Sequence, residues 1–207
     1  MKKQKLIVLG VASAAVVFAA GCNSGGQASY IDPGGTRSLI TADGVNTKDW
    51  QIASNALINS LLQSGELNRP DGRKTVVMIG VVKNKTAEHV DTNMLTNLIR
   101  SAMLRTGKAV VTTAVGGRGA EDKSTHQVRE LENDDVFNQA TVQKRGTAIA
   151  PDMSLAGEII QQRTVSGKRR ESYFQFHLTL TDLKTGLAVW EDTKEIAKQN
   201  RTQSVGW

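Results

Sequence analysis

The chain has 207 residues, of which 39% are hydrophobic, and this is enough for one folded domain with a modest core. Setting aside Lys2, Lys3 and Lys5 leaves 23 basic and 20 acidic residues, so the formal charge falls from +6 to +3. A balance of this size does not indicate nucleic-acid binding. The single cysteine, Cys22, excludes an internal disulfide.

The first 21 residues have the organisation of a secretory signal. A basic head over 1–5 is followed by an apolar run over 6–20, and small residues precede the cysteine. The alternative is a retained transmembrane helix, but crossing the hydrocarbon takes about 20 apolar residues and this run is shorter. We therefore expect residues 1–21 to be removed as a signal peptide.

The four residues Ala19-Ala20-Gly21-Cys22 resemble the lipobox of bacterial lipoproteins, in which the cysteine becomes the new N-terminus and carries acyl chains such as palmitate. A lone thiol in an exported protein is open to oxidation, so acylation is the more economical interpretation of Cys22. Two or more acyl chains hold a protein stably at a membrane. In Gram-negative lipoproteins, a residue other than Asp after the cysteine, here Asn23, implies the periplasmic face of the outer membrane.

A tether is predicted between the lipidated cysteine and the domain. Residues 23–45 contain five glycines, one proline and few apolar side chains. Fully stretched, they reach roughly 75–80 Å at about 3.4 Å per residue. The predicted organisation is therefore a signal peptide over 1–21, a lipidated cysteine and tether over 22–45, and a globular domain over 46–207.

The first part of the domain alternates helical and strand patterns. Apolar residues recur at helical spacing before Gly65 and again before Gly107, while two β-branched runs indicate strands. The predicted elements are a helix over 47–64 capped by Asn46 or Thr47, a buried strand over 74–82, a helix from 91 or 92 to 106, a short strand over 109–115, a loop over 116–124, and one or two surface helices over 125–145.

The C-terminal third changes to a two-residue period. Strands are predicted over 153–165 and 172–183, and in the second of these the apolar residues alternate from Phe174 to Leu180. A second hairpin turns at 184–186, and residues 199–207 look frayed. We expect an α/β fold: a mixed sheet of about four to five strands with flanking helices and C-terminal antiparallel hairpins.

The sequence offers no active site. His89, His126 and His177 have no second histidine or cysteine at ligand spacing, so no metal or other cofactor is expected. The glycine-rich run 116–123 lacks the spacing of a phosphate loop. The pairs Asp134-Asp135 and Glu191-Asp192 lack an apolar setting for acid–base work. We therefore predict that the protein has no catalytic residue and is not an enzyme.

The sharpest charge cluster is a basic hairpin tip formed by Arg163, Lys168, Arg169 and Arg170. As a functional feature it would contact an acidic partner or phospholipid headgroups. The alternative is a solvated tip whose charges discourage edge-to-edge pairing of strands. The same two interpretations apply to the surface residues 83–86 at the end of the first strand.

Several motifs together resemble the penicillin-binding protein activator family, LpoB. After the lipobox and tether, a strand ends in Asn84-Lys85-Thr86 and leads through a helix to Gly107-Lys108. The closing hairpin carries Thr185-Gly186 at its turn and Val189-Trp190 after it, so the resemblance covers roughly residues 47–198.

That resemblance implies a non-enzymatic outer-membrane lipoprotein. Its partner would be a bifunctional class A penicillin-binding protein, an inner-membrane peptidoglycan synthase, whose glycosyltransferase and transpeptidase activities it would stimulate. The alternative is an accessory structural lipoprotein of an envelope machine, such as a secretion channel or the flagellar basal region. The first hypothesis predicts a change in synthase rate, and the second predicts oligomers or co-purification with the machine.

Overall fold

The computed structural model describes residues 28–117 and 120–201, and the folded domain begins at Ile31. The predicted signal peptide and Cys22 lie outside the described residues. The elements are, in chain order, α1 (Thr47–Ser64), β1 (Thr75–Lys85), α2 (Asn93–Thr106), β2 (Ala109–Val111), α3 (Ser124–Glu130), β3 (Met153–Ser166), β4 (Arg169–Asp182) and β5 (Ala188–Arg201).

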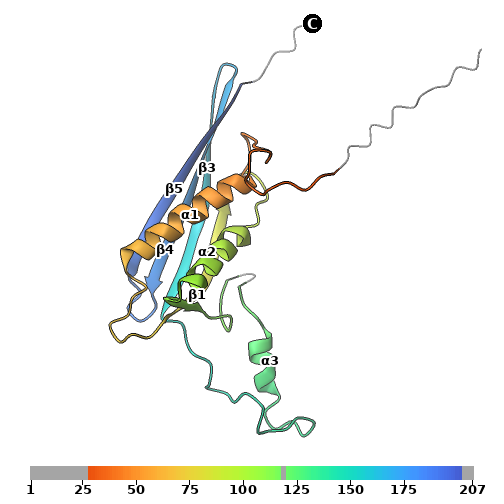
Figure 1. Ribbon diagram of the computed structural model, residues 1–207, viewed down its shortest axis with the longest axis vertical. Coiled ribbons are helices and arrows are strands. Elements are labelled where there is room, and N and C mark those ends of the chain that lie inside the picture. Colours follow the sequence, from red (N-terminus) through yellow and green to blue (C-terminus); the bar gives the residue numbers. More distant parts are fainter. Residues whose placement is uncertain (1–27, 118–119, 202–207) are drawn as a thin grey trace, which may run out of the picture. The chain divides into compact units, whose positions relative to one another are not determined.

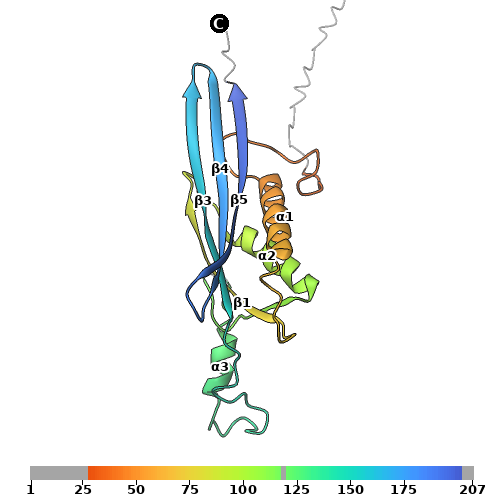
Figure 2. The same ribbon diagram turned by 90° about the vertical axis from the view of Figure 1, so that its left-hand side faces the viewer.

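The five strands form one mixed sheet in the order β2-β1-β3-β4-β5. β1 pairs in parallel with β2 and β3, whereas β3, β4 and β5 form two antiparallel hairpins. Helices α1 and α2 lie side by side on one face of this sheet, with α1 over β5 and α2 over β1 and β2 (Figures 1 and 2). The predicted α/β class, strand number and C-terminal hairpins are confirmed.

Helix α1 begins and ends where the sequence predicts. The Asn46 side chain accepts a hydrogen bond from the Asp49 backbone N–H, and the Asp49 carboxylate accepts one from the Asn46 N–H. This capping box satisfies two of the backbone donors that a helix N-terminus leaves without partners. Gly65 ends the helix with φ 84°, a left-handed conformation that glycine adopts without strain.

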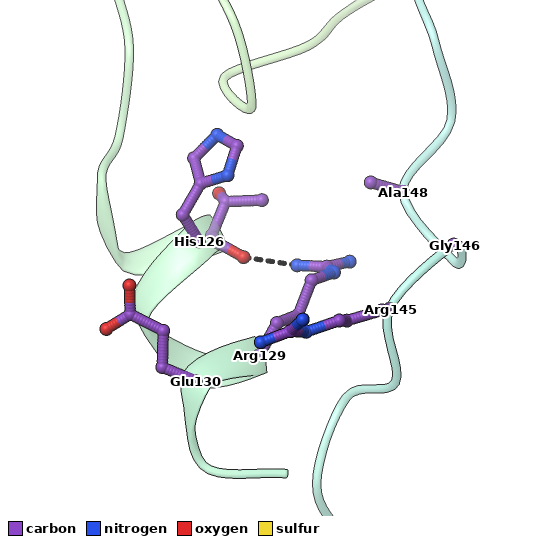
Figure 3. Close-up of a pocket in the computed structure, with 7 residues that line it drawn as sticks. His126, Arg129, Glu130, Arg145, Gly146 and Ala148 are labelled. Carbon is purple, nitrogen blue, oxygen red and sulfur yellow. Dashed lines mark hydrogen bonds between the residues drawn. The ribbon is translucent and has the colours of Figure 1, made fainter.

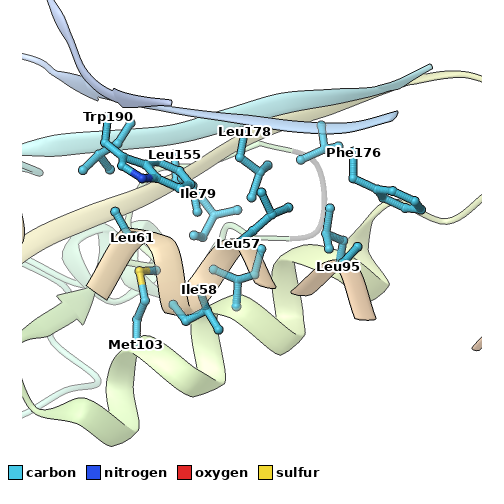
Figure 4. Packing of buried hydrophobic residues seen from close by; sticks show 14 of the residues in the cluster. Leu57, Ile58, Leu61, Ile79, Leu95, Met103, Leu155, Phe176, Leu178 and Trp190 are labelled. Carbon is cyan, nitrogen blue, oxygen red and sulfur yellow. The ribbon is translucent and has the colours of Figure 1, made fainter. Parts of the chain in front are cut away.

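The core lies between the two helices and the sheet. On β4, four alternating residues, Phe174, Phe176, Leu178 and Leu180, are each at most 1% exposed, as the two-residue period predicts. From the helices, Trp50 packs edge-on against Phe176 with ring centroids 5.7 Å apart, and Leu57 and Leu61 project toward the strands (Figure 4). These contacts remove apolar surface from water, and such burial is the main source of folding free energy.

Five elements differ in extent from their predictions by three residues or more: β1, β2, α3, β4, which begins at Arg169 rather than at residue 172, and β5. β1 continues to Lys85 because it pairs with β3 as far as Ile160, and β2 ends at Val111 after three residues. Within 125–145 only α3 forms, with seven residues; no side chain caps it and none of its residues is buried, so no packing extends it.

A further difference lies at the end of β5. Residues 199–201, predicted to be frayed, belong to the strand, because the backbone ladder with β4 continues until Arg201 stands opposite Arg169. Residues 202–207 lie outside the described part of the chain. The β3–β4 hairpin and the end of β5 therefore extend beyond Ser172, the buried residue of β4 that lies nearest the hairpin turn.

Among the described residues, no helix combines the length and the apolar character that a membrane span needs.

Truncating Leu57 to alanine tests the packing of α1 on the sheet. Leu57 is 1% exposed, so Leu57→Ala should lower the free energy of unfolding by about 2–5 kcal/mol through lost burial and a residual cavity. Ile52 on the same helix is 40% exposed, and Ile52→Ala should cost less than about 1 kcal/mol. Urea unfolding followed by circular dichroism measures both. Equal costs would contradict the packing.

Candidate interaction surfaces

The predicted basic tip closes the β3–β4 hairpin. Ser166 pairs with Arg169 across a two-residue turn whose first residue, Gly167, has φ 58°, as a type II′ turn requires. Lys168 occupies the second turn position, and Arg169 and Arg170 begin β4. All three basic side chains are exposed.

The tertiary structure adds a fourth cation to this tip and separates Arg163 from it. Arg201 of β5 stands directly opposite Arg169. Arg163 instead pairs with Ser172, three residues below the turn, and its guanidinium donates to the Asp43 backbone oxygen at 3.0 Å and lies 3.6 Å from Glu88. We call residues 164–171 and 199–201 the basic hairpin end. Arg201 is missed in the sequence because only strand pairing brings it there.

An N-terminal segment, residues 31–46, contacts the domain just below the basic hairpin end. The Asp43 oxygen also accepts from the Gln161 side chain at 2.9 Å, and the Gln51 side chain donates to the Pro33 oxygen at 2.8 Å. Gly44 lies so close to the Glu88 carboxylate that an added Cβ would fall 2.1 Å from one of its oxygens. This part of the predicted tether is therefore held against the sheet and α1.

A buried ion pair fastens the end of this segment. Lys198 Nζ lies 2.7 Å from Asp49 Oδ2, with the two side chains 9% and 6% exposed, and it also donates to the Gly44 backbone oxygen. The same ammonium lies 4.9 Å above the centre of the Phe174 ring, a cation–π distance. One side chain of β5 thus joins the sheet, the first turn of α1 and the N-terminal segment.

Removing one partner of this pair should be costly. Lys198→Ala leaves the Asp49 carboxylate buried without its cation, and we expect it to lower the free energy of unfolding by about 3–5 kcal/mol. The double variant Lys198→Met/Asp49→Asn removes both charges and should recover part of that loss. Lys184→Ala, at an exposed turn, serves as the control in urea unfolding. A Lys198→Ala cost no larger than the control would contradict this role.

The motif Asn84-Lys85-Thr86 comprises the last two residues of β1 and the first residue of the loop that follows it. The Asn84 side chain donates to the Glu88 backbone oxygen at 2.8 Å and accepts from the Thr86 N–H at 2.9 Å. The Thr86 hydroxyl donates to the same Glu88 oxygen, and the Ala87 N–H donates to the Gln161 side chain. Asn and Thr at these positions therefore shape the loop, and Lys85 alone projects a charge.

Lys85 Nζ lies 2.6 Å from Glu158 Oε2 on β3. The hydrogen bond from Lys85 is the main reason why the pKa of Glu158 lies below its ordinary value of 4.5. The positive charges of Lys85, His177 and Lys83 lower this pKa by smaller amounts. A carboxyl with a lowered folded-state pKa stabilises the fold above its unfolded pKa, and this contribution is lost as the pH falls through the folded value.

Titration of Glu158 followed by carbon NMR of its carboxyl group tests this contact. The native midpoint should lie below 4.5, and Lys85→Gln should raise it. Lys83→Gln removes only a minor contribution and should raise the midpoint less. An unchanged midpoint in Lys85→Gln would exclude the hydrogen bond in solution.

Two cavities lie near residues with candidate polar roles. One, of about 750 Å³, lies between the carboxyl end of β1 and the start of α2 and is lined by Lys83, Asn84 and His89, among others. The other, of about 360 Å³, lies beside α3, where Arg129 and Arg145 extend between the helix and residues 145–148 (Figure 3). Arg129 donates to the Thr125 backbone oxygen and to the Thr147 hydroxyl, so its role is to tie the loop to α3.

The histidines lie in separate parts of the domain, and two of them have one carboxylate nearby: His126 Nε2 lies 3.8 Å from Glu121 Oε1, and His177 Nε2 lies 3.8 Å from Glu191 Oε2. His126 contacts the Ala114 backbone oxygen at 2.7 Å, and His177, on the sheet face away from the helices, contacts the hydroxyls of Thr193 and Thr179. In the described part of the chain, no three His, Cys, Asp or Glu residues converge as metal ligands. Gly117 of the glycine-rich loop donates its N–H to the Ile79 oxygen at 2.7 Å and packs on Gly80. Its lack of a side chain therefore serves backbone packing.

The folded domain coincides with a known sequence family. The family described as "Peptidoglycan-synthase activator LpoB" matches residues 49–196, from the first turn of α1 to the middle of β5. The match covers more than half of the chain. The chain belongs to the LpoB family. The resemblance seen in the sequence is thereby confirmed, and the family is one of regulators whose named target is a peptidoglycan synthase.

Solved structures show weaker likenesses. The LpoB C-terminal domain from Salmonella enterica is 16% identical, with 72% of this chain and 98% of that chain covered and a TM-score of 0.38. The corresponding domain from Escherichia coli is 14% identical over the same shares, with a TM-score of 0.37. Lipoprotein GNA1162 from Neisseria meningitidis is 12% identical, with 63% and 88% covered and a TM-score of 0.32. A comparison of the sequence with curated proteins returns no match.

Proposed function

We propose that this protein is a non-enzymatic outer-membrane lipoprotein that activates a bifunctional class A penicillin-binding protein. The observation that carries the proposal is the LpoB family match over residues 49–196, which spans α1, the parallel strands and most of the C-terminal hairpins. The lipobox-like run ending at Cys22 supports attachment by acyl chains at the periplasmic face of the outer membrane.

An activator of this kind needs binding energy but no catalytic group. It must contact the active conformation of the synthase more tightly than the inactive one, and the difference in affinity sets the degree of activation. Lipid attachment confines the domain to one membrane surface, and the chain after Cys22 sets its effective concentration near the partner. The glycosyltransferase and transpeptidase reactions belong to the synthase.

The predicted tether overlaps the folded domain. Asp43, Gly44 and Pro33 accept hydrogen bonds from Arg163, Lys198 and Gln51 of the domain, which begins at Ile31. Eight residues lie between Cys22 and Ile31, and the nine steps from one to the other span at most about 31 Å. We infer that the synthase must approach the outer membrane closely, or that the contacts of the N-terminal segment open during binding.

Reconstitution tests the activator hypothesis. The purified acylated chain should bind a class A synthase of its host and raise both its glycan polymerisation and its peptide cross-linking rates. A Cys22→Ser chain should raise both rates in detergent but should no longer sediment with outer membranes after a high-salt wash, which removes loosely bound protein. The absence of any rate change with every class A synthase of the host would overturn the proposal. Co-purification with secretion or flagellar components would then favour the accessory role.

A further inference from the structure

We propose that the basic hairpin end docks on anionic phospholipid headgroups of the membrane that holds the acylated N-terminus. This inference rests on the proposed lipid attachment at Cys22. It assigns the cluster predicted from the sequence to lipid contact, with Arg201 added and Arg163 removed by the tertiary structure.

The charge of the basic hairpin end is strongly one-sided. Residues 164–171 and 199–201 contain four basic side chains and one acidic side chain, Glu171, which accepts a hydrogen bond from Gln199 at 2.9 Å. Within the described chain, no carboxylate forms an ion pair with Arg169, Arg170 or Arg201. Phosphate groups are the natural counterions of exposed guanidinium groups.

The placement of two arginines favours an external anion. Arg169 and Arg201 stand directly opposite each other on neighbouring strands, and like charges in such a pair repel. An anion seated between them would replace this repulsion with two favourable contacts. A lipid surface presents many such anions side by side, so both guanidinium groups of this pair can contact phosphate groups at the same time.

An apolar side chain accompanies the cations. Val165 is 67% exposed and pairs with Arg170 across the hairpin, so an apolar group and a guanidinium share one face. Apolar side chains bordered by basic residues are typical of segments that lie in a membrane interface, where the first enter the acyl boundary and the second contact headgroups. The sequence alone does not place Val165 beside Arg170.

The length of the chain brings this end within reach of the membrane. The N-terminal segment is held by Arg163 and Lys198, and the hairpin projects three residues, or about 10 Å, beyond Arg163. At most about 31 Å of chain separates Ile31 from the acylated cysteine. A lipid surface is therefore always present at high effective concentration, whereas an acidic protein must be recruited. For this reason we assign the basic hairpin end to a lipid surface and not to an acidic protein.

A fluorescence experiment on the full acylated chain tests the proposal. Cys22 is the only native cysteine and its thiol would be acylated, so Val165→Cys provides one site for an environment-sensitive dye. The dye should shift to the blue in vesicles containing about a third phosphatidylglycerol relative to phosphatidylcholine alone, and high salt should reverse the shift. Leu187→Cys, which is 64% exposed at the other hairpin turn, is the matched control and should not respond.

A second experiment measures vesicle partition of variants that lack the acyl chains or one of the arginine charges. The Cys22→Ser chain should partition onto phosphatidylglycerol vesicles, and each of Arg169→Gln, Arg170→Gln and Arg201→Gln should weaken partition about fivefold. Lys184→Gln, at the opposite turn, should leave it unchanged. Equal responses at positions 165 and 187, or partition that ignores the three arginines, would overturn lipid docking.

The outcomes separate this inference from the proposed function. If the acylated chain stimulates a synthase but the Val165→Cys dye ignores phosphatidylglycerol, lipid docking fails and activation stands. If the arginine variants lose stimulation in detergent without membranes, the basic hairpin end contacts protein, and lipid docking is overturned. If the purified chain carries no acyl group, lipid attachment fails, and docking on the membrane that holds the acylated N-terminus is overturned with it.

Discussion

The sheet is covered by helices on one face only, and this sets the limits of the core and the positions of the N-terminal segment and the exposed hairpin. The alternating residues of β4 from Phe174 to Leu180 face α1 and α2, and the intervening residues face away from them and are only half-buried. Because successive side chains of a strand point to opposite faces, a sheet with helices on one face buries only every second residue. The apolar core therefore ends where the helices end, and the strands beyond it carry polar and charged side chains.

The end of the helix-covered part of the sheet explains where the N-terminal segment and the Lys198–Asp49 ion pair lie. Ser172 is the last buried residue of β4 toward the hairpin turn, and beyond it no described helix covers the strands. The segment over residues 31–46 lies at this boundary and is bonded to the sheet through Arg163 and Lys198. The buried Lys198–Asp49 pair marks the point where the covered part of the sheet gives way to the exposed hairpin.

The same division of the domain suits a tethered regulator. A rigid core built from α1, α2 and five strands holds the exposed elements in fixed positions, because a closely packed interior resists deformation. Binding surfaces on such a core lose little conformational entropy when a partner arrives. The chain belongs to the LpoB family, whose description names a peptidoglycan synthase as the target of activation.

The fold class, the bounds of α1, the two hairpins and the family can all be read from the amino-acid sequence. These features depend on local periodicity and on capping residues such as Asn46 and Gly65, which act over a few neighbouring positions. Three other features appear only in the folded chain. Residues 199–201 extend β5, and Arg201 thereby joins the basic hairpin end. Arg163 and Lys198 hold the N-terminal segment. Each of these contacts joins residues at least 28 positions apart, as between Glu171 and Gln199. Their pairing depends on strand register and on burial in the assembled sheet, which no local pattern specifies.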